Sequence, residues 1–162
     1  AENYYHLLGL LNGSRVWKYI KKEYMTPRYP NDNNVGKYKV LIPESNGSGI
    51  LGEQLGKFEI GYPGDSSTTT FISIGSFETL KEAEYCSKYL KTKFVRCLLG
   101  ILKITQHNPQ ATWAYVPMQD FTPDSDIDWT KSIYDIDQQL YEKYKLTDDD
   151  CVFIEEKMKS ME

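Results

Sequence analysis

The stretch that decides the fold covers residues 79–121 and reads TLKEAEYCSKYLKTKFVRCLLGILKITQHNPQATWAYVPMQDF. Its first half carries apolar residues at helical spacing, and Thr79 with Glu82 has the spacing of a capping box. We therefore predict one long amphipathic helix over residues 80–105, followed by a polar loop and a strand over residues 112–116.

Basic residues gather on the face of this predicted helix that lies opposite its apolar residues. They are Lys81, Lys88, Lys91, Arg96 and Lys103. A helix that packs on one side and is cationic on the other suits a polyanion held against a rigid scaffold. The same pattern also arises where Lys and Arg only solvate an exposed helix face, and the sequence leaves both interpretations open.

Strands are predicted before this helix, and further helices after it. Alternating or β-branched runs predict strands over residues 14–20, 37–43, 57–60 and 69–74. Two more helices are predicted over residues 133–144 and 147–159, with Thr147 as the N-cap of the second. This order predicts an α+β fold, in which a small mixed or antiparallel sheet packs on the long helix and two helices follow at the C-terminus.

The 162 residues suit a single domain, residues 1–162, with a core of its own. Within it we expect a peripheral N-terminal segment over residues 1–36, an α+β core over residues 37–121 and a helical tail over residues 130–160. The chain begins Ala-Glu-Asn-Tyr-Tyr without an initiator Met, as expected of a fragment of a longer protein.

Charge is spread unevenly along the chain, although the net charge is only −4. Residues 1–114 hold 14 Lys and Arg against 10 Asp and Glu, whereas residues 115–162 hold 5 against 13. A mildly basic body with an acidic tail allows a local anion-binding face despite the low pI.

No apolar run reaches the ~18 residues of a membrane helix, and three cysteines, an odd number, favour reduced thiols. We therefore expect a cytoplasmic protein with no membrane partner.

Glycines mark two places of interest. Gly47, Gly49 and Gly52 spell G-x-G-x-x-G, but the helix that a dinucleotide-binding fold requires does not follow them. A loop that contacts a phosphate backbone is the better interpretation. Gly100 costs about 1 kcal/mol against Ala within a helix, which predicts a close packing contact at that position.

A further pattern is that of Mg²⁺-dependent nucleases, in which carboxylates hold the metal and a lysine polarises the phosphate. Asp124, Glu155 and Lys157 supply these residue types. Glu155 and Lys157 fall in a predicted helix, however, where positions two apart point to different sides. We therefore predict no catalytic residue, no metal site and no cofactor in this chain, and a nuclease fragment is the alternative.

The remaining candidates form a recognition surface around the end of the long helix. Basic side chains there would neutralise phosphates, while amide and imidazole side chains would approach base edges. The candidate phosphate contacts are Lys88, Lys91, Arg96 and Lys103, and the candidate base contacts are Gln106, His107, Asn108, Gln119 and, in the Gly-rich loop, Asn46 and Ser48. The amides also suit caps of a helix end or a turn, and that alternative stays open.

Four short pieces of the sequence carry a family resemblance. They are IGSF at residues 74–77, YLKTKF at 89–94, VPMQDF at 116–121 and LYEKY at 140–144. With them, residues 37–161 resemble the C-terminal portion of bacterial adenine-specific DNA methyltransferases of type II restriction–modification systems. That family includes enzymes that fuse a nuclease and a methylase in one polypeptide.

The resemblance implies a target recognition domain that docks double-stranded DNA for the N-terminal catalytic domain of the same polypeptide. That catalytic domain binds S-adenosylmethionine, and Mg²⁺ is added where the parent enzyme also cleaves DNA. The catalytic Asn/Asp-Pro-Pro-Tyr loop is not present here, because Asn108-Pro109 is followed by Gln110 and Ala111, so no methyl transfer is expected. A docking module for a partner subunit or domain, formed by the acidic C-terminal helices, is the further alternative.

Overall fold

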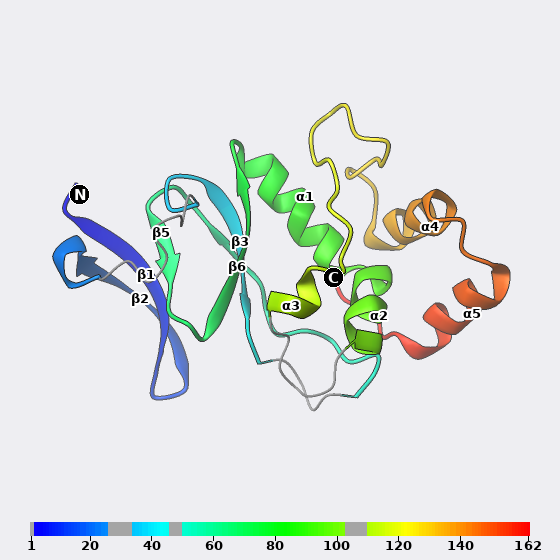
Figure 1. Cartoon of the computed structure of the whole chain (residues 1–162), viewed down its shortest axis with the longest axis horizontal. Helices are drawn as coiled ribbons and strands as arrows, with labels where there is room; N and C mark the ends of the chain where they lie inside the picture. The colour runs from blue at the N-terminus through cyan, green and yellow to red at the C-terminus, as the bar shows by residue number, and fades with distance from the viewer. Residues whose placement is uncertain (1, 26–33, 46–49, 103–109) are drawn as a thin grey trace. The chain divides into compact units, whose positions relative to one another are not determined.

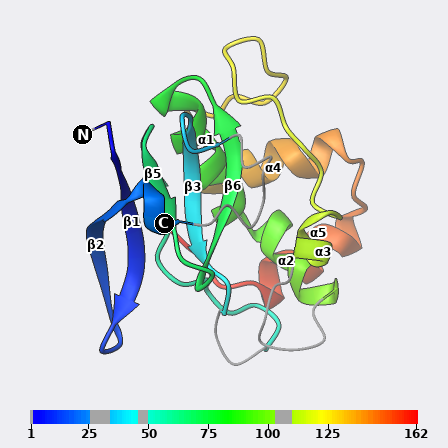
Figure 2. The same ribbon diagram turned by 60° about the vertical axis from the view of Figure 1, so that its left-hand side comes forward.

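The computed structural model describes residues 2–25, 34–45, 50–102 and 110–162 (Figure 1). Its architecture is α+β, as the sequence predicts, because strands come first along the chain and most helices follow them. Figure 2 shows the same elements after a rotation of 60°. None of the described helices is both long and apolar enough to cross a bilayer.

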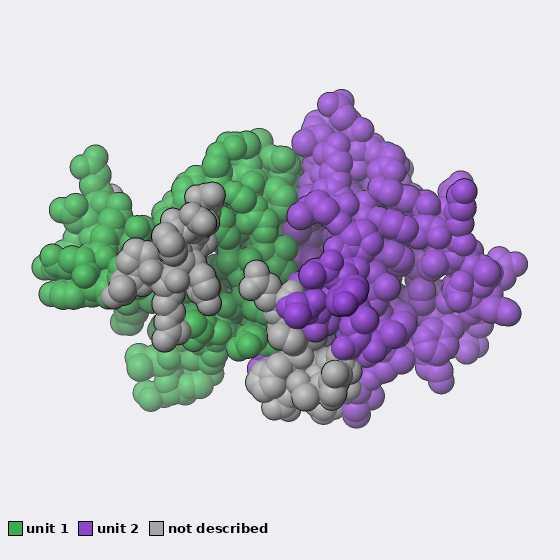
Figure 3. Space-filling view, in the orientation of Figure 1, with its two compact units in different colours: residues 1–44, 57–84 green, residues 45–56, 85–162 purple. Residues whose placement is uncertain are grey.

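The chain forms two compact units, which Figure 3 shows in different colours. Unit 1 comprises residues 1–44 and 57–84, and unit 2 comprises residues 45–56 and 85–162. The predicted core and tail do not coincide with these units, because one boundary between the units falls inside the first α-helix.

The first sheet of unit 1 is mixed and has the strand order β2-β1-β5. Strand β1 (Tyr4–Leu11) pairs antiparallel with β2 (Ser14–Lys21) and parallel with the short strand β5 (Asp65–Ser67). Every residue of β1 and β2 is paired. The Asn12-Gly13 turn that joins them has positive φ at both residues, 51° and 77°, as in a two-residue type I′ turn.

The second sheet of unit 1 is antiparallel and has the order β4-β3-β6. Its strands are β3 (Tyr38–Pro43), β4 (Glu59–Gly61) and β6 (Phe71–Phe77). The four strands predicted before the long helix correspond to β2, β3, β4 and β6, whereas β1 and β5 are not predicted from the sequence. Buried side chains of both sheets meet in one cluster of Leu8, Leu41 and Phe71.

A lysine on β3, Lys39, is fully buried in unit 1. Its Nζ donates to the backbone oxygens of Asn34 (2.6 Å), Val35 (3.2 Å) and Asp65 (2.7 Å). A Cβ at Gly61 would come within 2.8 Å of the Lys39 Cγ, so glycine leaves room for the lysine stem. Backbone carbonyls thus replace the water that a buried ammonium group loses.

Unit 2 is built from helices and connecting segments. The described helices are α1 (Leu80–Lys91), which begins in unit 1, α2 (Lys93–Leu102), α3 (Gln110–Trp113), α4 (Ile133–Lys143) and α5 (Asp148–Lys157). The capping box of Thr79 and Glu82 is present at the start of α1. The two predicted C-terminal helices are confirmed: Ser132 caps α4, and Thr147 with Asp150 forms a capping box at α5.

The long helix predicted over residues 80–105 is interrupted at Thr92, so that α1 and α2 are separate helices. Asp137 on α4 accepts hydrogen bonds from Lys93 N at 3.0 Å and from Phe94 N at 2.9 Å. Thr92 Oγ1 accepts a third bond from the first turn of α2, at 3.2 Å. The prediction of a continuous helix was wrong here, because the break is stabilised by a side chain that lies far away in the sequence.

The strand predicted over residues 112–116 is also wrong. Residues 110–113 form the short helix α3, and a turn follows, in which Tyr115 N donates to Thr112 O and Val116 N donates to Trp113 O. The aromatic and β-branched residues of this stretch favour a strand by local preference, but their backbone groups bond within helical turns instead.

Two glycines, which lack a side chain, allow the segment of residues 50–56 to pack closely against its neighbours in unit 2. A Cβ at Gly100 would lie 2.4 Å from Leu51 Cδ1, so the predicted packing contact at Gly100 is confirmed. Gly52 has φ of +94°, and a Cβ there would lie 1.9 Å from Lys157 O. Lys159 N donates to Gly52 O at 3.0 Å. The last glycine of the G-x-G-x-x-G pattern therefore serves close backbone packing.

We expect the stability of the fold to depend on the protonation of Asp137. Burial raises the pKa of this carboxyl from its ordinary value of 3.8 to about 6, although the bonds from Lys93 and Phe94 favour the charged form. Between these two values folding takes up a proton, so the free energy of unfolding falls as the pH rises through this range. Urea denaturation between about pH 4 and 7 will show that the free energy of unfolding falls less with rising pH for Asp137→Asn than for the wild type.

The matched control is Asp149→Asn, which removes an exposed carboxylate from α5. We expect its free energy of unfolding to change with pH as steeply as that of the wild-type protein. An Asp137→Asn variant whose unfolding free energy changes with pH as steeply as that of the wild type contradicts this account.

Candidate nucleic-acid interface

The ten residues predicted to contact DNA divide into two groups. Six of them lie outside the described residues: Asn46, Ser48, Lys103, Gln106, His107 and Asn108. The other four, Lys88, Lys91, Arg96 and Gln119, are described.

Arg96 lies in the interior of unit 2, with only 3% of its surface exposed. Its guanidinium donates to the backbone oxygens of Lys91 (3.1 Å), Glu53 (3.4 Å) and Lys159. Burial lowers the pKa of Arg96 from its ordinary value, and the carboxyl of Asp137 opposes that shift. The prediction that Arg96 belongs to an outer cationic face is therefore wrong: this side chain crosslinks three backbone segments.

Lys88 on α1 is likewise engaged within unit 2. Its Nζ donates to Trp129 O at 3.0 Å and to Lys131 O at 2.8 Å. Lys91, at the end of the same helix, is half-buried. A row of phosphate contacts requires basic side chains that point into solvent. The basic side chains of this helix do not all do so.

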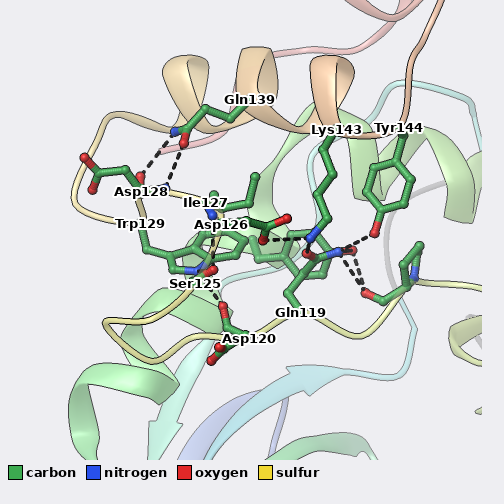
Figure 4. A network of polar contacts seen from close by, with 12 residues as sticks. Gln119, Asp120, Ser125, Asp126, Ile127, Asp128, Trp129, Gln139, Lys143 and Tyr144 are labelled. Atoms are coloured by element: carbon green, nitrogen blue, oxygen red, sulfur yellow. Dashed lines mark hydrogen bonds and ion pairs between the residues drawn. The ribbon is translucent and has the colours of Figure 1, made fainter.

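Gln119 is buried, with 7% of its surface exposed, in the polar network drawn in Figure 4. Its Nε2 donates to the hydroxyl of Tyr144 at 2.7 Å, and its Oε1 accepts from Lys143 Nζ at 2.9 Å. A weaker contact joins Nε2 to the hydroxyl of Tyr89 at 3.3 Å. Both ends of the amide are used, so Gln119 links the segment after α3 to α4.

The acidic segment that follows Gln119 is bound to α4 as well (Figure 4). Gln139 accepts from Asp128 N at 2.7 Å and donates to Asp128 O at 3.3 Å. Lys143 forms an ion pair with Asp126 at 2.9 Å. Trp129 Nε1 donates back to Asp120 O at 2.7 Å. The carboxylates of this segment therefore belong to a structured loop.

The alternative of a nuclease site gains no geometric support. Both carboxylate oxygens of Glu155 have partners, since Lys93 Nζ lies 2.6 Å from Oε2 and the Tyr141 hydroxyl lies 3.0 Å from Oε1. Asp124 is exposed on the loop before α4. Within the part of the chain that the structure describes, no three His, Cys, Asp or Glu side chains come together as a metal site.

A basic and aromatic surface lies instead on the β1–β2 hairpin of unit 1 and on the 3₁₀ turn η1 (Lys22–Tyr24) that follows it. We call these exposed residues the hairpin surface: Lys18, Tyr19, Lys21, Lys22 and Tyr24. Side chains alternate along a strand, so Tyr19 and Lys21 lie on one face of β2 and Lys18 lies on the other. All five residues are exposed, Tyr19 to 74% and Tyr24 to 72%. Lys21 Nζ lies 5.9 Å from the centre of the Tyr24 ring.

An ordered aromatic stack supports this surface. The His6 ring stacks on Trp17 at a centroid distance of 4.5 Å and on Tyr19 at 4.8 Å, with interplanar angles of 21° and 28°. His6 Nδ1 also lies 2.9 Å from Asp65 Oδ1, and Asp65 Oδ2 accepts from Tyr62 N. The imidazole is therefore held both by ring contacts and by a carboxylate that is itself fixed.

The sequence contains a pattern that indicates the hairpin surface. The DNA contacts were instead predicted mainly on and after the helix of residues 80–105, because of its helical periodicity. Residues 14–24, SRVWKYIKKEY, interleave four basic residues with three aromatic ones and contain one acidic residue. Such interleaving is typical of nucleic-acid contacts, whereas residues 1–36 were expected to form only a peripheral segment.

Comparison of the chain with protein-family models, with curated proteins and with solved structures finds no match in any of the three.

We expect Arg96→Met to lower the free energy of unfolding by about 1–3 kcal/mol, because it leaves buried carbonyl groups without their donor. Chemical denaturation measures the change, and Lys157→Met on the exposed face of α5 is the matched control. A variant of unchanged stability that binds DNA more weakly would instead support the phosphate contact that the sequence predicts.

Gln119→Leu is expected to lower the free energy of unfolding by about 1–2 kcal/mol, because Lys143 and Tyr144 lose a buried partner. Thermal and urea denaturation measure this effect. Gln138→Leu, at an exposed position of α4, is the control and should cost much less. Unchanged stability together with an altered DNA sequence preference would contradict the structural role.

Proposed function

We propose that this chain is the target recognition domain of a bacterial type II restriction–modification enzyme with adenine-specific DNA methyltransferase activity. It binds double-stranded DNA in the cytoplasm and positions it for the catalytic domain of the same polypeptide. S-adenosylmethionine belongs to that catalytic domain, as does Mg²⁺ where the parent also cleaves DNA. The resemblance of residues 37–161 to this family supports the proposal.

The observation that carries DNA binding is the hairpin surface. Lys18 and Lys21 of β2 and Lys22 of η1 are exposed, and Glu23, the acidic residue among them, lies 3.5 Å from Lys21 Nζ. Basic side chains that neutralise phosphates release counterions and supply most of the sequence-independent affinity for DNA. A two-stranded β-ribbon is also an element that the major groove of DNA admits.

This proposal divides the contacts differently from the one based on helical periodicity. Lys88 and Arg96 bond to backbone carbonyls within unit 2, so the phosphate contacts are assigned to the hairpin surface. The base contacts predicted at residues 46–49 and 106–108 and the phosphate contact predicted at Lys103 lie outside the described residues and stay predictions, as does the contact predicted at Lys91.

The direct test is a triple variant, Lys18→Gln with Lys21→Gln and Lys22→Gln. We expect it to bind duplex DNA of any sequence more weakly and to reduce the slope of log K against log salt by about 2–3, roughly 0.9 for each phosphate that is no longer neutralised. Fluorescence anisotropy with a labelled duplex, over a series from about 50 to 200 mM salt, measures both quantities.

The matched control removes three exposed lysines of unit 2, Lys131, Lys145 and Lys157, by substitution with glutamine. It changes the net charge by the same amount but leaves the hairpin intact. Equal losses of DNA affinity and of salt slope in the two triple variants would mean that net charge alone attracts DNA. In that case the assignment of phosphate contacts to the hairpin is wrong.

A further inference from the structure

The stack of Trp17, His6 and Tyr19 runs from the core of unit 1 towards solvent. Trp17 packs against the buried cluster that contains Leu8, and the His6 side chain is 33% exposed. Tyr19, opposite His6 in the register of the hairpin, is 74% exposed. Trp17 and His6 are partly buried, whereas Tyr19, the last ring, is held on one side by His6 and open to solvent over most of its surface.

We propose that Tyr19 is a stacking platform for one unpaired base of DNA. This inference rests on the proposed function and adds to it the state of the DNA that the domain prefers. A base inside an intact duplex has both of its faces covered by neighbouring bases. An aromatic ring therefore stacks only on a base that is unpaired, extruded or terminal, and such contacts tolerate any sequence because every base has a π-face.

The stack is held by contacts within unit 1, which favours a gain in affinity when a base joins it. His6 is held by Asp65 at 2.9 Å and by the Trp17 ring at 4.5 Å, so the face that supports Tyr19 is fixed. A base that joins such a stack does not have to order a mobile side chain first. Single aromatic side chains that stack on bases contribute roughly 5- to 150-fold in affinity.

The positive charge of Lys21 beside Tyr19 favours a nucleic acid strand as the partner. Lys21 follows Tyr19 on the same face of β2, because side chains alternate along a strand, and it lies opposite Tyr4 on β1. Tyr4 is 43% exposed and extends the aromatic part of this face. Lysine beside exposed rings suits a phosphate that is linked to a stacked base.

The test compares two labelled duplexes that differ in one nucleotide: one contains a single unpaired adenine, and the other contains an unpaired abasic nucleotide at the same place. We expect the full chain to bind the first at least about 5-fold more tightly in an anisotropy titration. Tyr19→Ala should abolish this preference, while Tyr19→Phe, which retains the ring, should keep it. Tyr134→Ala, at an exposed tyrosine of α4 outside the hairpin surface, should also keep it.

The outcomes separate this inference from the proposed function. Equal binding of the two probes by the wild type, or a preference that survives Tyr19→Ala, overturns the stacking platform. The proposed function stands in that case if both probes still bind through the three lysines. Failure to bind either probe or the fully paired duplex overturns both proposals.

Discussion

The break between α1 and α2 at Thr92 is the constraint on which unit 2 depends. Ending one helix and beginning another leaves backbone groups without helical partners, and each of them needs a substitute. Asp137 supplies two acceptors for the start of α2, and Arg96 donates to the last carbonyl of α1. Because Asp137 lies on α4 and Arg96 also bonds to Lys159, the same break fixes α4 and the C-terminal segment against α2.

Buried charge in this region follows from that arrangement. A guanidinium or a carboxylate loses hydration on burial, and the loss is tolerated where fixed dipoles take the place of water. Arg96 is surrounded by carbonyl oxygens and Asp137 by N–H groups at the positive end of α2. Lys39 in unit 1 follows the same rule, since three carbonyls surround its ammonium. In both units, interior cations therefore bond to backbone oxygens.

Sequence reasoning succeeds here where structure is local and fails where it is not. The capping boxes at Thr79 and Thr147 join residues three apart, so their patterns identify helix starts correctly. The break at Thr92 has neither glycine nor proline, and Asp137, its main partner, lies 44 residues beyond Lys93. Helical periodicity places Arg96 opposite the apolar residues, but its guanidinium is buried against backbone oxygens of distant segments, so periodicity alone misplaced this candidate DNA contact. Strand β5 spans three residues and forms by pairing with β1, which no local pattern announces.

The hairpin surface has a second explanation, which the aromatic stack helps to exclude. β2 is the edge strand of its sheet, and lysines on edge strands prevent unwanted pairing with other chains. That role accounts for Lys18 and Lys21, but it does not require an exposed tyrosine held in a fixed orientation by a histidine and a tryptophan. Edge protection is served equally well by any charged or small residue in place of Tyr19. The combination of exposed lysines with an ordered, solvent-facing ring therefore supports the proposed recognition of a strand that carries both phosphates and bases.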